Sequence, residues 1–157
     1  MSVRLLLAVV LAGALVAASM PAIDAAQRAQ ADSELSRAVE EIETATVAMV
    51  RHSDPVPPDV PGATRRITVE PPSQPKDATL TIGPARDTRP RNRSVIAVQI
   101  PGEPVDRTRI SPTIRPLGPD GTVDWDGSIA VTEPVELTLT YREVDGSPVI
   151  EVARGFK

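Results

Sequence analysis

The chain has 157 residues, a formal net charge of −4 and no cysteine. This length suits one domain with an additional anchoring segment. The mild acidity argues against a nucleic-acid partner, and the lack of cysteine excludes disulfides, zinc–thiolate sites and thiol nucleophiles. Trp, Tyr and Phe occur once each, so a core must be built from Val, Ile and Leu. Of the 17 prolines, all except Pro21 follow residue 54, which excludes long helices from the C-terminal two thirds.

Residues 1–23 contain an apolar run that predicts a membrane anchor. Leu5 to Ile23 holds 19 residues without a formal charge. As a helix, this run would span roughly 28 Å, close to the ~30 Å hydrocarbon core of a bilayer. Gly13 and Pro21 are its weak points, and Pro21 predicts a kink near the membrane exit. Arg4 precedes the run, so the positive-inside tendency predicts a cytoplasmic amino terminus and an extracytoplasmic remainder.

The same run fits a second interpretation, a secretory signal peptide that is removed. Ala17 and Ser19 offer small residues for cleavage after Ser19, but the run is long for a signal peptide and Pro21 follows the site closely. Retention would give a single-pass protein of the cell membrane that contacts lipid through residues 5–23. Cleavage would release a secreted β-domain module. We favour retention.

Residues 24–52 are predicted to form an amphipathic stalk helix. Their apolar side chains follow spacings of three and four, at Leu35, Ala38, Ile42, Ala45 and Met49, with Val39 and Val50 beside them. The helix should end at His52-Ser53-Asp54-Pro55, because a residue before proline disfavours helix. The stripe fits either a seam for self-association or packing on the chain's own strands. Its short length and its two alanines favour internal packing.

Residues 53–64 form a proline-rich linker that we expect to be extended and stiff. Residues 65–157 then show short alternating segments, clearest at 67–69, 80–82, 96–100 and 135–141. Asp145-Gly146 between two such segments predicts a hairpin, and Pro119 to Thr122 predicts another turn. The predicted class is α+β: a long N-terminal helix, anchor plus stalk, followed by a small antiparallel β domain with one sheet of about five to eight short strands.

Residues 122–133 resemble part of a calcium-binding loop. Asp124, Asp126, Gly127 and Glu133 match positions three, five, six and twelve of an EF-hand loop. Thr122 stands where the first acidic ligand is expected, and prolines on both sides oppose flanking helices. The alternative, which we favour, is a pair of turns in which Asp-Gly serves turn geometry. Asp124, Asp126 and Glu133 are the metal candidates of the sequence.

Other chemical signals are sparse. Asn92-Arg93-Ser94 is an N-glycosylation sequon, so Asn92 is a candidate acceptor if this region is extracytoplasmic. His52 is the single histidine, without a second histidine or a cysteine for a metal site, and no nucleotide-binding glycine motif is present. We therefore predict no catalytic residue, no cofactor and no enzymatic activity.

The order of the apolar run, Pro21, the unbroken amphipathic helix and the β domain resembles the type IV pilin architecture, which includes the pseudopilins of secretion systems. The resemblance implies that Leu5 to Arg51 form a spine for anchoring and assembly, that Pro21 bends it, and that pilus or secretion-system proteins are partners. Two motifs of that family are missing. Arg4 meets Leu5 directly where a processing site would lie, and the first acid is Asp24 instead of a glutamate within the run.

The acidic, cysteine-free composition, rich in alanine and valine, also resembles that of small haloarchaeal membrane proteins. The sequence thus predicts a non-enzymatic, single-pass, extracytoplasmic protein that serves as an accessory or minor pilin-like subunit of a type IV pilus or secretion assembly. The alternative is a secreted β-domain binding module formed by signal-peptide cleavage.

Overall fold

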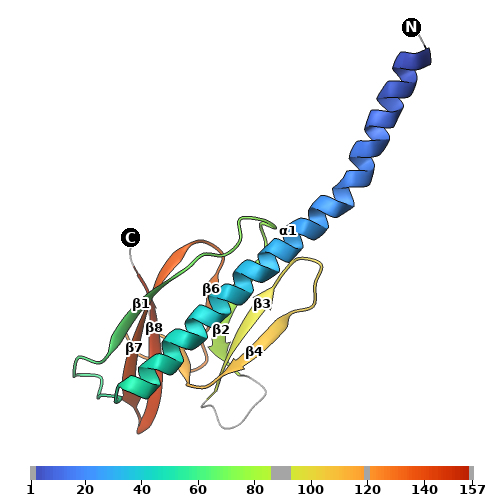
Figure 1. The fold of residues 1–157 in the computed structure, drawn as a ribbon. Helices are drawn as coiled ribbons and strands as arrows, with labels where there is room; N and C mark the ends of the chain where they lie inside the picture. Colours follow the sequence, from blue (N-terminus) through green and yellow to red (C-terminus); the bar gives the residue numbers. More distant parts are fainter. Residues whose placement is uncertain (1–2, 86–92, 119–120, 156–157) are drawn as a thin grey trace.

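The computed structural model describes residues 3–85, 93–118 and 121–155. In these ranges the chain forms one helix, α1 (Val3–His52), followed by eight strands. Figure 1 shows the strands gathered into a head beside the C-terminal part of the helix, while the N-terminal part extends away from it. The predicted α+β class, a long N-terminal helix before a small antiparallel-rich β region, is confirmed.

The helix α1 is continuous through Pro21, where the proline ring removes one backbone donor and crowds the preceding turn. Figure 1 shows a change of direction between the darker blue N-terminal part and the part beside the strands, as a proline favours. The predicted end at His52 is confirmed. Arg51 lies in the last turn, at the negative end of the helix dipole, and the Nδ1–H of His52 donates to the carbonyl of Ala48 at 2.9 Å.

The described strands form two four-stranded sheets, so the prediction of a single sheet was wrong. One sheet has the order β1-β7-β8-β5 and the other the order β4-β3-β2-β6. The strands are β1 (Thr64–Val69), β2 (Thr79–Pro84), β3 (Ser94–Gln99), β4 (Asp106–Ile110), β5 (Ile114–Pro116), β6 (Ile129–Val131), β7 (Val135–Val144) and β8 (Ser147–Arg154). Their pairs are antiparallel except for β5 with β8, which is parallel. Alternation along a strand indicates its buried face but does not say which strands pair.

Three short strands cannot be recognised from the sequence pattern. β4 reads DRTRI and buries Ile110 alone among its five residues. β5 reads IRP and is buried at all three positions, and β6 reads IAV. A period of two cannot be recognised in so few residues. These strands complete the two sheets through pairing with longer neighbours.

The turn between β7 and β8 confirms the predicted Asp-Gly hairpin. Asp145 has a φ of 52° and Gly146 a φ of 73°, and positive φ at both central positions is the requirement of a type I′ turn. The two strands pair from Val144 with Ser147 to Leu137 with Arg154. In the other predicted turn, residues 119–120 lie outside the described ranges, and Gly121 has a φ of 76°.

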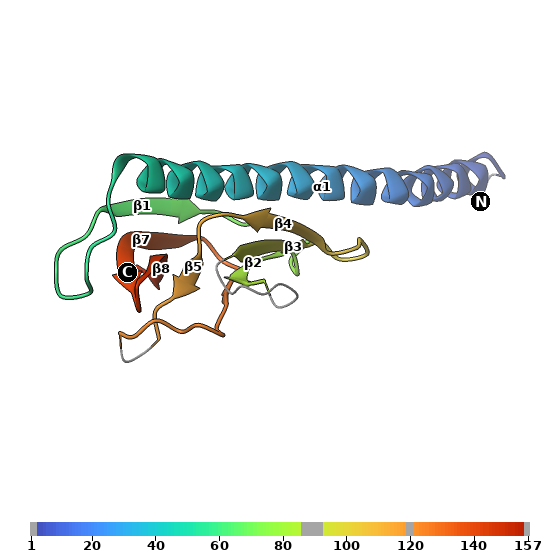
Figure 2. The ribbon, with the colours of Figure 1, turned by 90° about the horizontal axis from the view of Figure 1, so that it is seen from below.

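The apolar stripe of α1 packs on the head, which confirms the prediction of internal packing. Its members are at most 8 % exposed: Ala31, Leu35, Ala38, Ile42, Ala45 and Met49. They share one core cluster with residues of both sheets, among them Leu80, Ile96 and Leu137. Figure 2 shows α1 running along one side of the two sheets, with its N-terminal part extending beyond them. The helix therefore covers both sheets with its C-terminal half alone.

The proline-rich linker is fastened to β7 and does not behave as a free spacer. Val56 forms a parallel bridge with Arg142. The Nη1 of Arg142 also donates to three linker carbonyls, those of Pro57, Pro58 and Val60, at 3.2, 2.6 and 2.8 Å. A guanidinium suits this task because it presents several donors in a fixed plane. The linker thus fixes the place at which β1 begins.

Candidate membrane-binding surface

The N-terminal part of α1 exposes apolar side chains around its whole circumference. Nine large apolar residues are 52 to 80 % exposed: Val3, Leu7, Val9, Val10, Leu11, Leu15, Val16, Met20 and Ile23. Monomeric soluble proteins rarely expose contiguous apolar patches larger than a few hundred Å². This surface therefore requires a covering that the chain's own head does not provide.

The same segment satisfies its own polar groups. Between Leu5 and Ile23, Ser19 is the one residue with a side-chain hydroxyl, amide or charge, and its Oγ–H donates to the carbonyl of Val16 at 2.8 Å. The backbone groups bond within the helix, except where Pro21 has no N–H. A helix that bonds its own polar groups suits hydrocarbon, and the exception here is the carbonyl of Ala17, which Pro21 leaves without its helical donor.

The length of the segment matches a bilayer. From Leu5 to Ile23 the helix extends about 28 Å at 1.5 Å per residue, against a hydrocarbon core of about 30 Å. In the described ranges, α1 is the one helix that is long and apolar enough to cross a membrane. A signal sequence near an amino terminus has the same length and composition. The structure therefore supports an anchor or a signal sequence at this position.

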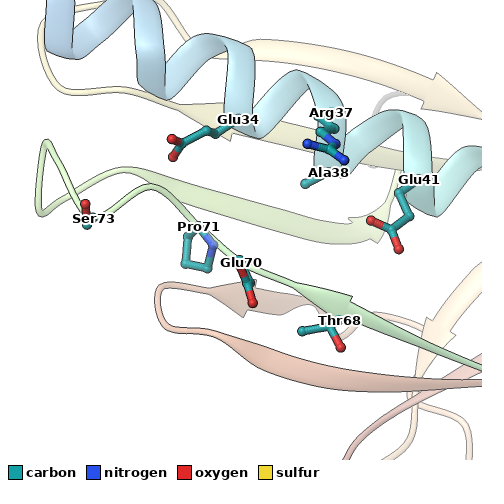
Figure 3. A pocket seen from close by; sticks show the side chains of 8 residues that line it. All are labelled: Glu34, Arg37, Ala38, Glu41, Thr68, Glu70, Pro71 and Ser73. Atoms are coloured by element: carbon teal, nitrogen blue, oxygen red, sulfur yellow. The ribbon is translucent and has the colours of Figure 1, made fainter.

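Two open grooves flank the C-terminal half of α1. The larger, of about 540 Å³, lies between α1, β1 and the loop after β1. It is shown in Figure 3 and is lined by Glu34, Arg37, Ala38, Glu41, Thr68, Glu70, Pro71 and Ser73. The smaller, of about 250 Å³, lies toward β3 and β4 and is lined by Asp32, Ser36, Val39, Glu40, Glu43, Val98, Asp106 and Thr108.

Both grooves are acidic, and their described linings contain neither histidine nor cysteine. In Figure 3 the carboxylates of Glu34 and Glu41 are spread along the helix and that of Glu70 lies apart from them, so the three do not converge. Catalytic carboxylates act in pairs held close around a substrate, and metal ligands converge on one ion. This groove has the chemistry of a solvated polar surface.

A family described as a domain of unknown function, DUF7311, matches residues 2–155. The chain belongs to this family. The match takes in the apolar segment as well as the head, so a DUF7311 domain comprises both parts. No curated protein and no solved structure matches the chain.

In this DUF7311 protein, the segment that resembles a calcium-binding loop forms a turn, the interpretation that the sequence favours. One carboxylate oxygen of Asp124 accepts the N–H groups of Asp126 and Gly127, at 3.1 and 2.8 Å. A Cβ at Gly127 would collide with that carboxylate, which explains the glycine. Glu133 is exposed between β6 and β7, and neither flank of the loop is a helix. Across the described residues, no three His, Cys, Asp or Glu side chains are grouped so that they could hold a metal ion.

The glycosylation candidate Asn92 lies outside the described residues. The third residue of its sequon, Ser94, is described, and it is fully buried at the start of β3. Its hydroxyl accepts the N–H of Ile114 at 2.7 Å and donates to the carbonyl of the same residue at 3.0 Å. Ser94 thus bonds the backbone of β5 in the facing sheet.

Sequence reasoning missed the buried polar cluster to which Ser94 belongs. Arg115 in β5 is fully buried, and its Nη1 donates to the Oγ of Ser94 at 3.0 Å and to the carbonyl of Ile114 at 2.6 Å. The guanidinium carbon lies 5.7 Å from the ring centroid of Trp125, within the range of a cation–π contact. The cluster joins the two sheets. No periodicity marks it in the sequence, because β5 has only three residues.

A second polar contact lies where the linker meets the head. The Nε of Arg142 donates to Glu151 at 2.8 Å, and both side chains are largely buried. Nearby, Tyr141 is 4 % exposed. Burial raises the pKa of Tyr141, and the carboxylate of Asp54 adds to the rise. Arg142 therefore ties the linker to β7 and β8.

Proposed function

We propose that this DUF7311 protein is a non-enzymatic, single-pass membrane protein that α1 anchors and whose β head is extracytoplasmic. The observation that carries the proposal is a single continuous helix that is exposed and apolar on all sides before Ile23 but buries one stripe after Ala31. Burial of apolar surface in lipid is favourable by roughly 25 cal/mol per Å². Arg4 ahead of the apolar run supports an inside amino terminus.

The length of the apolar run supports retention of the anchor. Its 19 uncharged residues exceed the roughly 7 to 15 apolar residues that are typical of a signal peptide. The scattered carboxylates of the groove in Figure 3 support a role other than catalysis.

Within this function, we assign the protein the place of an accessory or minor pilin-like subunit of a type IV pilus or secretion assembly. The support is the layout, in which one helix serves as both membrane segment and backing of a β head. The head already covers the stripe from Ala31 to Met49. Contacts between subunits would therefore come from residues 3–23, the part of α1 that the head leaves exposed.

Alkaline carbonate extraction of membranes from cells that express the full chain tests the anchor. We expect the full chain to stay in the membrane pellet and a variant without residues 3–23 to be soluble. Protease added outside spheroplasts should digest the head of the full chain. Release of the full chain by carbonate would contradict the anchor, and a protected head would contradict the orientation.

The pilin-like assignment has its own test. With a photo-crosslinking residue at Leu15, which is 66 % exposed, the full chain should form adducts with pilus or secretion-system subunits. The matched control is Ser33, an exposed residue further along α1. If Leu15 forms no adduct with pilus or secretion-system subunits, the assembly role is contradicted, although the membrane anchor is not.

The second candidate function is a secreted β-domain binding module. The observations that favour it are the small residues Ala17 and Ser19 and the place of the apolar run near the amino terminus. In that case the mature protein would lack Leu5 to Ser19 and would be found in the medium. The two functions therefore differ in one measurable property, the amino terminus of the mature chain.

A further inference from the structure

The head presents a rigid turn between β3 and β4. The N–H of Glu103 donates to the carbonyl of Ile100 at 3.0 Å, and Pro101 and Gly102 occupy the two central positions. Gly102 has a φ of 84°, which together with proline before it fits a type II turn. Ile100 is 3 % exposed, so the base of the turn is fixed in the core. The turn has little freedom to move relative to the sheets.

This turn lies at the end of the head that is nearest to the anchor. A Cβ placed on Gly102 would lie 4.0 Å from the guanidinium of Arg28. Long side chains of a helix lean toward its N-terminus, so the turn lies level with Arg28 or on its N-terminal side. Figures 1 and 2 both show the connection between β3 and β4 reaching along α1 toward the N-terminal part.

Helix geometry gives the height of this contact above the hydrocarbon. Ile23 is the last residue of the apolar run and Asp24 the first acid, so the boundary of the hydrocarbon falls near them. Arg28 lies five residues further, which is about 7.5 Å along the axis. The headgroup layer on each side of a bilayer is roughly 5 to 8 Å thick.

We infer that residues 101–105, the turn between β3 and β4, rest in the lipid headgroup layer as a second membrane contact of this protein. The inference rests on the proposed function, because it requires that residues 3–23 span a bilayer. The segment reads Pro-Gly-Glu-Pro-Val and has one charged side chain, Glu103. It therefore suits a zwitterionic lipid surface. A rigid turn on that surface, together with the helix, would fix the orientation of the head.

The lack of native cysteine allows a direct test by single-cysteine labelling of the full chain. Glu103→Cys places a fluorophore in the turn. Glu143→Cys is the matched control, since both residues are exposed glutamates. The N–H of Glu143 bonds the carbonyl of Val56 at 2.8 Å, four residues beyond the end of α1, so this position lies at the far end of the head. Leu15→Cys reports on the anchor.

Each labelled protein is reconstituted into phosphatidylcholine vesicles that carry a spin-label quencher either on the headgroup or within the acyl chain. We expect the headgroup quencher to remove most of the emission at position 103 and to leave the emission at position 143 unchanged. The acyl-chain quencher should quench position 15. If the headgroup quencher affects positions 103 and 143 equally while the acyl-chain quencher still quenches position 15, the headgroup contact is overturned and the anchor is not. An unquenched position 15 would overturn the anchor and the contact together.

A length variant separates a true height effect from an effect of the label. Seven helix-forming residues inserted between Asp24 and Ala25 raise the head by about 10 Å and rotate it by only ~20°. We expect the headgroup quencher to lose its effect on position 103 in this variant, whereas position 15 stays quenched. Quenching at 103 that survives the insertion would contradict the inferred contact.

Discussion

The two halves of α1 have similar apolar side chains but opposite surroundings. From Leu7 to Ile23, large apolar residues point in all directions and remain more than half exposed. From Ala31 to Met49, apolar residues follow one stripe and are buried against the two sheets. A uniform apolar surface suits lipid, and a stripe suits a protein core. The arrangement of apolar residues around the helix, more than their number, thus distinguishes the two environments.

The largest expected effect comes from the same substitution made in each half. Leu35→Ala removes a fully buried side chain and should lower the free energy of unfolding of the head by about 2 to 5 kcal/mol. Leu15→Ala should leave it unchanged, because Leu15 is 66 % exposed and does not touch the core. Urea unfolding of both full-chain variants in mild detergent measures the difference. Equal losses would mean that the two halves do not differ as described.

A charge in the anchor should weaken membrane insertion, whereas a charge in the other half of α1 should not. Leu15→Arg places a guanidinium near the middle of the apolar run and should make membrane insertion less favourable by about 3 kcal/mol. Ser33→Arg, at an exposed position of the other half, should not change membrane partition. The measurement is the fraction of each variant in the membrane pellet after carbonate extraction. Unchanged pelleting of Leu15→Arg would argue against a spanning segment.

A smaller effect is expected from the cluster of Ser94 and Arg115 that joins the two sheets. Ser94→Ala leaves the N–H and carbonyl of Ile114 without the hydroxyl that both now contact, which should cost about 1 to 3 kcal/mol. Ser128→Ala, at an exposed serine of the head, is the control and should be nearly neutral. Thermal unfolding of the two variants makes the comparison. A neutral Ser94→Ala would show that the cluster does not stabilise the contact between the two sheets.

The smallest effect concerns pH. Burial and Asp54 raise the pKa of Tyr141 above its ordinary value of 10.0, so the folded state holds this proton more tightly than the unfolded state. The resulting stability is fully present below pH 10 and is lost as the pH rises through the folded pKa. Tyr141→Phe should flatten the decline in the urea midpoint above pH 10. If the urea midpoints of the native protein and of Tyr141→Phe decline equally above pH 10, groups other than Tyr141 cause the decline.

Local pattern was enough to predict the helix, its end at His52, the Asp-Gly hairpin and the packing of the stripe. Each depends on neighbouring residues, through spacing or through the φ that a residue favours. The division into two sheets was not predictable, since β5 is a three-residue strand that joins β8 from a distant part of the chain. The hydrogen bond between Ser94 and Arg115 was not predictable for the same reason, because it depends on how distant parts of the chain are placed. Residues 21 apart meet only because two sheets face each other.

The central claim is that the exposed apolar half of α1 stays on the protein as its membrane anchor. Mass spectrometry of the native protein, purified from membranes, tests this claim most directly. We predict an intact amino-terminal peptide that retains Leu5 to Ile23. A mature chain that begins near Met20 would contradict the claim, because it would leave the head without the anchor and would make the secreted module the correct function.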